Sequence, residues 1–215
     1  MATPPRLNPP PRELMIVGGN LALDFTNTVD DPLGPGHHDH AGTYADVVDW
    51  SLRAGTVTDS QASRLLRTAS RRPAEAATAL DSAHSLRSGL SDIFEGVVDS
   101  SGRVPSTSWL RLRPFVVDAY ASALVEDGGQ GRGRFAWPHS DELAVVLHPI
   151  AFAAAQLLVS DDLDRIKRCA RCPWFFLDNS KNRSRRWCTM SDCGKAVKME
   201  RYVARRAASR SASRH

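Results

Sequence analysis

Apolar residues in the central part of the chain recur every three or four positions, which predicts a body built mainly from amphipathic helices. The longest apolar stripe, over residues 80–97, predicts one long helix that begins at Pro73. Two shorter helices are predicted over residues 43–55 and 58–71, because each segment starts with a threonine that can cap the first turn.

The hydrophobic pattern changes at four further places. Residues 15–17 predict a short strand, and Pro114 is expected to break one helix and start the next. A glycine-rich turn within residues 124–137 predicts a small β-hairpin. Residues 141–159 predict a last body helix, capped by its first residue and kinked at Pro149.

The only four cysteines of the chain form two short pairs near its C-terminal end, Cys169-x2-Cys172 and Cys188-x4-Cys193. Disulfides would need an oxidising compartment, and the proline-rich N-terminus shows no apolar signal-peptide core. A thioredoxin-like redox site would use only one Cys-x2-Cys pair. The spacing therefore predicts a Zn²⁺ site with four thiolate ligands, and such a closed shell is structural rather than catalytic.

The residues around the cysteines predict a compact finger. The first pair leads into an apolar strand at residues 174–177, and a polar, basic loop follows at 180–186. A second strand is expected at residues 187–188, and residues 191–192 can cap a helix that begins near Cys193. A knuckle, a hairpin and a helix that carries the last ligand at its start are typical of a treble-clef-like zinc finger.

Charge divides the chain into two unlike parts. From Arg165 onward there are fifteen Lys and Arg and only three acids, whereas the preceding residues hold thirteen bases and twenty-one acids. A basic tip on an acidic body favours nucleic-acid contact at the tip over a merely solvated surface. The residues predicted to make this contact are Arg183, Arg185, Arg186, Lys195, Lys198, Arg201 and Arg205.

These observations predict a mainly α fold with a small β-hairpin (α+β). We expect a disordered proline-rich arm at residues 1–12, a helical domain at 13–164, the zinc finger at 165–208 and a disordered tail at 209–215. No apolar run reaches the 18 residues of a membrane-spanning helix, so a cytoplasmic protein is expected.

Two segments resemble a known pair of bacterial domains. Residues 185–194, RRWCTMSDCG, resemble the CGNR-type zinc finger, and residues 18–28, GGNLALDFTNT, resemble the opening of the ABATE domain that usually precedes it. Together the two domains would cover nearly the whole chain. The resemblance implies a stress-associated transcription regulator that binds DNA through its finger. One departure is clear: Lys195-Ala196 stands where the family pattern has Asn-Arg, so the arginine fork is missing.

The predicted function is thus a zinc-dependent, DNA-binding transcription regulator, whose helical domain senses a signal or forms a homodimer. An RNA-binding or ribosome-associated protein is the alternative, since the same charges suit both nucleic acids. An enzyme in the N-terminal domain is a weaker alternative, because the sequence shows no phosphate loop and no free cysteine nucleophile.

Two polar groups in the body have two interpretations each. Asp24, Asn27 and Thr28 either bond to the backbone of a turn or line a pocket for a small-molecule ligand. The cluster at residues 37–40, with three histidines and an aspartate, is either an exposed loop or a metal site, and we favour the loop.

Overall fold

The computed structural model describes residues 14–30, 38–99, 102–137 and 142–212, and most of them are helical. We call the part before Arg165 the body and the part from Arg165 onward the finger. The body helices are α1 (Leu21–Thr26), α2 (Tyr44–Arg53), α3 (Asp59–Arg71), α4 (Pro73–Val98), α5 (Ser106–Ala121) and α6 (His148–Leu158), with short 3-10 turns η1 (Leu143–Leu147) and η2 (Asp161–Arg165) on either side of α6.

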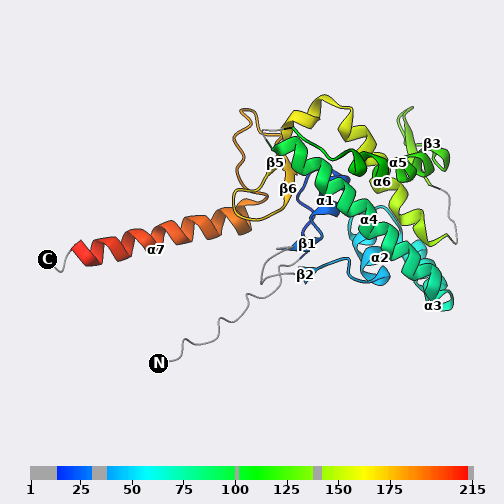
Figure 1. Ribbon diagram of the computed structural model, residues 1–215, viewed down its shortest axis with the longest axis horizontal. Coiled ribbons are helices and arrows are strands. Elements are labelled where there is room, and N and C mark those ends of the chain that lie inside the picture. Colours follow the sequence, from blue (N-terminus) through cyan, green and yellow to red (C-terminus); the bar gives the residue numbers. More distant parts are fainter. Residues whose placement is uncertain (1–13, 31–37, 100–101, 138–141, 213–215) are drawn as a thin grey trace.

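Helix α4 is the central element of the body. It packs against α1, α2, α3 and α5, and it also contacts strand β5 (Ile166–Arg168) of the finger. In Figure 1 it runs diagonally through the body, with α3 near its first residues and β5 near its last. Its predicted apolar stripe is the centre of the core, where Leu86, Leu90, Ile93 and Phe94 are fully buried.

The predicted helix starts are confirmed by their caps. Thr43 and Asp46 form a capping box at the start of α2, and Thr58 and Gln61 form another at the start of α3. Pro73 occupies the first turn of α4, where its missing N–H leaves no intrahelical bond unmade.

The strands form three small antiparallel pairs. β1 (Val29–Asp30) pairs with β2 (His38–Asp39), β3 (Leu124–Asp127) with β4 (Gly133–Ala136), and β5 with β6 (Phe175–Leu177). The β3–β4 pair is the predicted hairpin of the body. The predicted mainly α fold with small β-hairpins is therefore confirmed.

The finger begins with the β5–β6 hairpin and ends in a long helix. One π-helical turn, η3 (Met190–Gly194), leads directly into α7 (Lys195–Ala212). Figure 1 shows α7 projecting away from the body. Helix α7 continues to Ala212, which differs from the finger boundary at 208 and the tail start at 209 that the sequence predicts.

Body and finger share their hydrophobic cores. Met15 and Val17 of the body pack against the cysteine cluster, and the Leu177 N–H donates to the Gly18 carbonyl at 2.7 Å. The finger residues that belong to the body core are Ile166, Phe175 and Leu177. The finger is therefore docked on the body over a packed surface, and the sequence boundary near 164 does not separate two independent cores.

Four predicted elements differ in the structure. Residues 187–188 form no strand, because the strand that pairs with β6 is β5, which precedes the first cysteine pair. Residues 15–17 form no ladder of strand bonds; this segment lies beside β6 through the Gly18 carbonyl. Pro114 lies inside α5, because buried side chains on both sides of it, Leu112 and Ala119, hold the helix in place across the lost backbone bond. Pro149 lies in the first turn of α6 and so begins a helix rather than kinking one.

Two other predictions, the proline-rich arm at 1–12 and the cap at Asp141, lie outside the described residues.

Candidate metal centre and nucleic-acid surface

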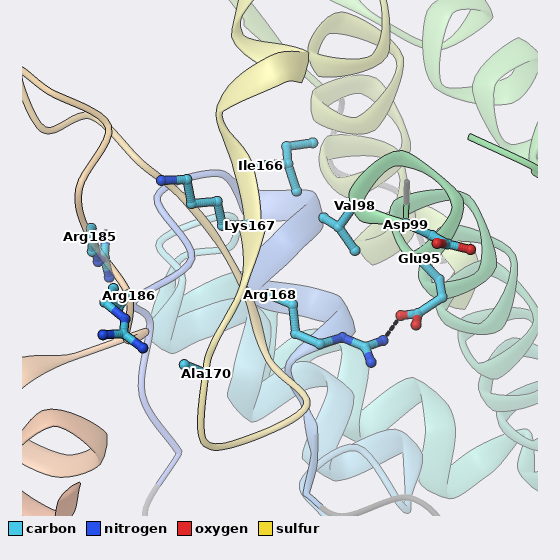
Figure 2. Close-up of a pocket in the computed structure, with 9 residues that line it drawn as sticks. All are labelled: Glu95, Val98, Asp99, Ile166, Lys167, Arg168, Ala170, Arg185 and Arg186. Carbon is cyan, nitrogen blue, oxygen red and sulfur yellow. Dashed lines mark ion pairs between the residues drawn. The ribbon is translucent and has the colours of Figure 1, made fainter. Parts of the chain in front are cut away.

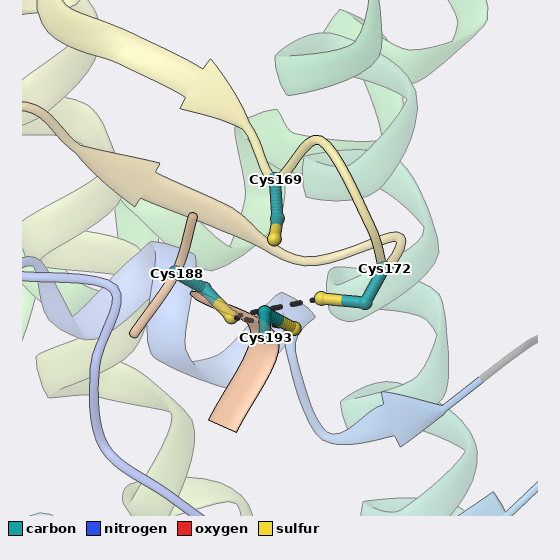
Figure 3. A group of neighbouring side chains, drawn as sticks. All are labelled: Cys169, Cys172, Cys188 and Cys193. Atoms are coloured by element: carbon teal, nitrogen blue, oxygen red, sulfur yellow. Dashed lines mark hydrogen bonds between the residues drawn. The ribbon is translucent and has the colours of Figure 1, made fainter. Parts of the chain in front are cut away.

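The four cysteines converge on one point under the finger hairpin. All four side chains are buried, and their Sγ atoms lie within 4.8 Å of one another (Figure 3). Two Sγ–Sγ distances, Cys172–Cys188 and Cys188–Cys193, are 3.6 Å. A tetrahedron of thiolates around an ion at about 2.3 Å has edges of about 3.8 Å. The donor set therefore fits a tetrahedral metal site.

Electrostatics also favour a cation at this point. Side-chain hydrogen bonds with Cys169 and Cys172 raise the pKa of the Cys188 thiol most, and burial and repulsion between neighbouring thiolates add to the rise. A divalent ion reverses this effect by attracting all four thiolates at once. Within the described part of the chain, no other group of three or more potential ligands comes together in this way.

Short-range bonds shape both knuckles. The Cys169 N–H donates to the Trp174 carbonyl at 2.9 Å and closes the first knuckle, and the side chains of Trp174 and Phe176 are buried beside the cluster. At the second knuckle the cap is Thr189, whose hydroxyl accepts from the Ser191 N–H at 3.3 Å. The helical turn therefore begins at Met190, before the predicted cap at residues 191–192, and Cys193 lies inside it.

Arg185 is a structural residue of the finger and not an exposed cation. Its guanidinium donates to the carbonyls of Trp187 at 3.0 Å and Val17 at 3.2 Å, and it also contacts the Cys188 carbonyl. The same group lies 4.4 Å from the centre of the Phe176 ring. These partners occupy the guanidinium inside the molecule, so the predicted role of Arg185 in nucleic-acid contact is not supported by its position.

The other six predicted contact residues are exposed. On α7 the four cations share one face of a helix that projects into solvent (Figure 1). On the preceding loop, the Arg186 guanidinium lies 5.6 Å from the centre of the Trp187 ring. The exposed residues are Arg183, Arg186, Lys195, Lys198, Arg201 and Arg205.

Sequence reasoning missed the residue that shapes this loop. Asp178 is fully buried, and its carboxylate accepts from Lys167 Nζ at 2.7 Å, from the Ser180 hydroxyl at 2.6 Å and from the Arg185 N–H at 3.0 Å. Burial opposes ionisation, but the bonds from Lys167 and Ser180 hold the pKa of Asp178 well below its usual range. The only signal in the sequence was a turn-forming Asp-Asn-Ser run.

Asn27 and Asp24 connect the body to the finger. Asn27 exchanges two hydrogen bonds of 2.8 Å with the backbone of Phe175, as a neighbouring strand residue would. Asp24 accepts from the Val17 and Gly18 N–H groups at 2.7 and 2.6 Å, and this holds the segment that bonds β6. Between Gly18 and the start of α1 the chain turns at Gly19, whose φ of 79° favours glycine.

Thr28 completes this polar group on the body side. Its hydroxyl donates to the Phe25 carbonyl and accepts from Arg87, at 2.8 and 2.9 Å. Asp24, Asn27 and Thr28 are all at most 4% exposed, and each has partners within the protein. Their positions support the turn-bonding interpretation and not the interpretation as the lining of a ligand pocket.

The buried position of Asp24 predicts a measurable titration. Burial raises its pKa to about 6, although the bonds from Gly18 and Val17 and the charge of Arg185 oppose the rise. A raised folded-state pKa means that the stability contributed by protonated Asp24 is complete below about pH 4 and is lost as the pH rises through 6. We expect a carboxyl ¹³C NMR titration with a midpoint near 6 that is absent in Asp24→Asn. A midpoint below 4 would contradict this expectation.

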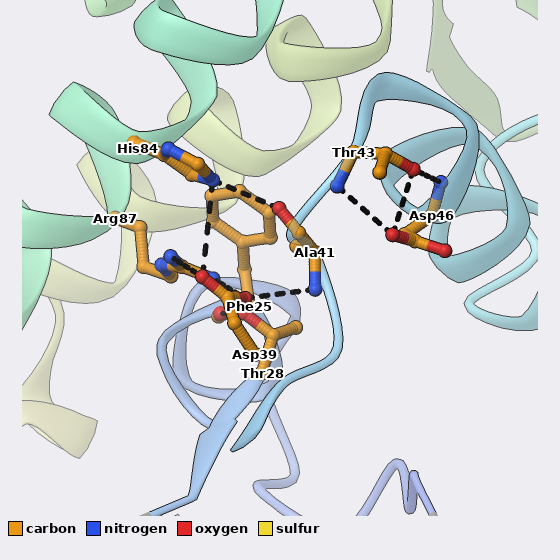
Figure 4. Close-up of polar contacts among 8 residues, drawn as sticks. All are labelled: Phe25, Thr28, Asp39, Ala41, Thr43, Asp46, His84 and Arg87. Atoms are coloured by element: carbon orange, nitrogen blue, oxygen red, sulfur yellow. Dashed lines mark hydrogen bonds and ion pairs between the residues drawn. The ribbon is translucent and has the colours of Figure 1, made fainter. Parts of the chain in front are cut away.

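The histidine-rich loop is part of a second polar network (Figure 4). Asp39 accepts two 2.6 Å bonds from Arg87, and His84 lies 3.9 Å from the same carboxylate. Burial raises the pKa of Asp39, but the Arg87 bonds outweigh it and lower the pKa overall. His40 pairs with Asp30 at 3.2 Å, and His37 lies outside the described residues. The described members of this loop therefore anchor the β1–β2 pair to α4.

Comparison with known families agrees with the two-part structure. Residues 165–206 match the CGNR zinc finger, and residues 19–161 match the ABATE model, described as "Putative stress-induced transcription regulator". The chain belongs to the ABATE family. No curated protein matches the chain. The order, ABATE body first and CGNR finger second, is the one that the sequence motifs predict.

The structure gives a reason for the ABATE motif. The LDFxNT residues at 23–28 lie where the ABATE body holds the CGNR finger, so they join the two matched segments physically. In the part of the chain that is described, none of the helices has the length and apolar character needed to cross a membrane.

Proposed function

We propose that this protein is a zinc-dependent regulator that binds duplex DNA through its finger, with α7 and the loop before it as the contact surface. The observation that carries the proposal is helix α7. It starts at the metal centre, projects from the body and carries Lys195, Lys198, Arg201 and Arg205 on one exposed face. The major groove of DNA accommodates a single α-helix, and lysine and arginine neutralise its phosphates.

Zinc fits the metal centre better than the other common ions. Four thiolates in a closed tetrahedral shell are the donor set of structural zinc. The ion would be held by Cys169, Cys172, Cys188 and Cys193 and would join the hairpin to the start of α7. In this proposal zinc fixes the direction of α7 and takes no part in chemistry.

The departure from the family pattern affects the manner of contact. Lys195 is exposed at the first position of α7, and Ala196 follows it where the family has arginine. A lysine ammonium is a point charge without the bidentate fork that reads guanine. We therefore assign Lys195 to a phosphate rather than to a base edge.

The ABATE body has two features suited to its proposed role in a cytoplasmic regulator, one for sensing a ligand and one for dimerisation. A cavity of about 500 Å³ lies between the start of α3 and the β3–β4 hairpin, with Phe135 and Trp137 on one wall. Helix α5 exposes a stripe of large apolar side chains to solvent. The residues of this stripe are Trp109, Leu110, Val117 and Tyr120. The cavity supports a small-molecule ligand, and the stripe supports a homodimer contact.

The proposal is tested by the salt dependence of binding. With four to six exposed cations engaged, log K for a duplex should fall against log salt with a slope of about −4 to −5. Arg201→Ala should flatten the slope by about 0.9, whereas Arg64→Ala, which removes an exposed cation from α3 of the body, should leave it unchanged. Fluorescence anisotropy with labelled duplex DNA measures both slopes.

Single-stranded RNA of matched length is the competitor in the same assay. Preference for this RNA over every duplex would replace the DNA proposal with the RNA-binding alternative. Equal slopes for wild type, Arg201→Ala and Arg64→Ala would remove α7 from the contact surface.

A further inference from the structure

A cleft of about 570 Å³ separates the end of α4 from the finger. Glu95 and Asp99 line it from α4, and Lys167 and Arg168 line it from β5. Arg186, which also belongs to the predicted nucleic-acid surface, lines it from the loop before the second cysteine pair (Figure 2). With Arg185, the lining holds four basic residues and two acids, and the cavity continues the proposed contact surface onto the body.

The cations in this cleft differ in how firmly they are held. Lys167 bonds the buried carboxylate of Asp178 at 2.7 Å, and this pair is part of the finger core. Arg168 forms an ion pair with Glu95, and the side chains of both are close to half exposed, at 45% and 48%. Exposed ion pairs of this kind contribute little net free energy, so a competing anion can separate them at small cost.

We infer that this cleft is a phosphate site, in which a backbone phosphate of the bound nucleic acid takes the place of the Glu95 carboxylate on Arg168. The inference rests on the proposed function and extends its contact surface to a residue that the sequence analysis did not single out. A guanidinium can bind either a carboxylate or a phosphate through two parallel N–H bonds, so a phosphate can take the position of the Glu95 carboxylate on Arg168.

Glu95 then has a regulatory effect on binding. In the free protein it neutralises Arg168, and in the complex its carboxylate lies beside a phosphate and repels it. The ABATE body thus lowers the affinity of the finger through one acidic side chain. Charge alone would confine the contact surface to the tip of the finger. Arg168 lies instead at the base of the finger, against α4, so the contact surface reaches the body.

The test is a double-mutant cycle on the full-length protein, read by anisotropy with duplex DNA over a range of salt concentrations. Glu95→Gln should tighten binding about two- to fivefold, the range that an exposed ion pair allows. Arg168→Ala should weaken binding and flatten the salt slope by about 0.9. In the Arg168→Ala background, Glu95→Gln should keep only the small gain due to its change in net charge.

Glu126→Gln is the matched control. Glu126 pairs with exposed Arg134 at 2.7 Å on the β3–β4 hairpin, so its loss gives the same charge change without touching the cleft. Equal gains from Glu95→Gln and Glu126→Gln would overturn the inference, as would a salt slope unchanged by Arg168→Ala. If wild type binds duplex with the expected slope and these results occur, the cleft assignment fails and the proposed function stands.

A second arm identifies the source of the phosphate. Inorganic phosphate is titrated into the protein while the Arg168 side-chain Nε–H signal is followed by NMR, and duplex DNA is titrated in parallel. A shift of the Arg168 signal with duplex at far lower concentration supports a backbone phosphate. Saturation by inorganic phosphate with no further shift on adding duplex would instead make the cleft a free-phosphate site. Absence of duplex binding by wild type would remove the proposed function and the cleft inference together.

Discussion

Replacing Cys172 by serine is expected to abolish tight zinc binding and to destabilise the body as well as the finger. Structural zinc in a small finger contributes about 10–16 kcal/mol of apparent binding free energy at neutral pH. Without it the β5–β6 hairpin, whose connecting loop carries Cys169 and Cys172, loses its fixed end. That hairpin supplies Phe175 and Leu177 to the core of the ABATE body, so the effect crosses the junction. Elemental analysis measures the zinc content, and thermal unfolding followed by circular dichroism measures the stability.

Ala170→Ser is the control for this experiment. It places a serine in the same knuckle at an exposed position between the two cysteines, and it should keep one zinc per chain and the wild-type unfolding temperature. A Cys172→Ser protein that retains full zinc content would refute the four-thiolate site. A Cys172→Ser protein whose helical body melts at the wild-type temperature would show instead that the body is stable without a folded finger.

Replacing Asn27 by alanine is expected to have the second-largest effect, a loss of about 2–6 kcal/mol in the free energy of unfolding. The substitution leaves the N–H and the carbonyl of Phe175 buried without their side-chain partners. Each unsatisfied buried group costs about 1–3 kcal/mol. Urea unfolding with linear extrapolation measures the difference between variant and wild type.

Asn20→Ala provides a comparison with the same chemical change. Asn20 caps α1 through a single 2.9 Å bond from the Ala22 N–H, so its loss should cost about 1 kcal/mol. If Asn27→Ala costs no more than Asn20→Ala, the two bonds to Phe175 do not hold the finger on the body.

Local chemistry explains what could be predicted from the sequence. A threonine followed three residues later by Asp or Gln caps a helix wherever it lies, and Thr43 and Thr58 do so. The stripe on α4 buries itself because its spacing matches the helix period. Two cysteines at short spacing lie on one tight turn, so the sulfur atoms of each pair come close together.

Predictions failed where distant contacts outweigh local preference. Pro114 normally ends a helix, yet α5 continues through it because Leu112 and Ala119, on either side of the proline, are buried in the core. Pro149 has the same chemistry but begins α6, where a missing N–H carries no cost. The sequence shows a proline in both places, and only the neighbouring elements decide its effect.

For charged and polar residues, too, the sequence decided some properties and the tertiary structure decided others. The sequence by itself determined the helical body, the two cysteine pairs that form one cluster and the basic character of the finger, because these depend on composition and on spacing along the chain. Only the tertiary structure decided that Arg185 donates to carbonyls inside the finger, that Asn27 forms hydrogen bonds with β6, and that Glu95 forms an ion pair with Arg168. An arginine in the sequence carries the same charge whether its partner is a carbonyl, a carboxylate or a phosphate, and the partner is chosen by residues far away in the chain.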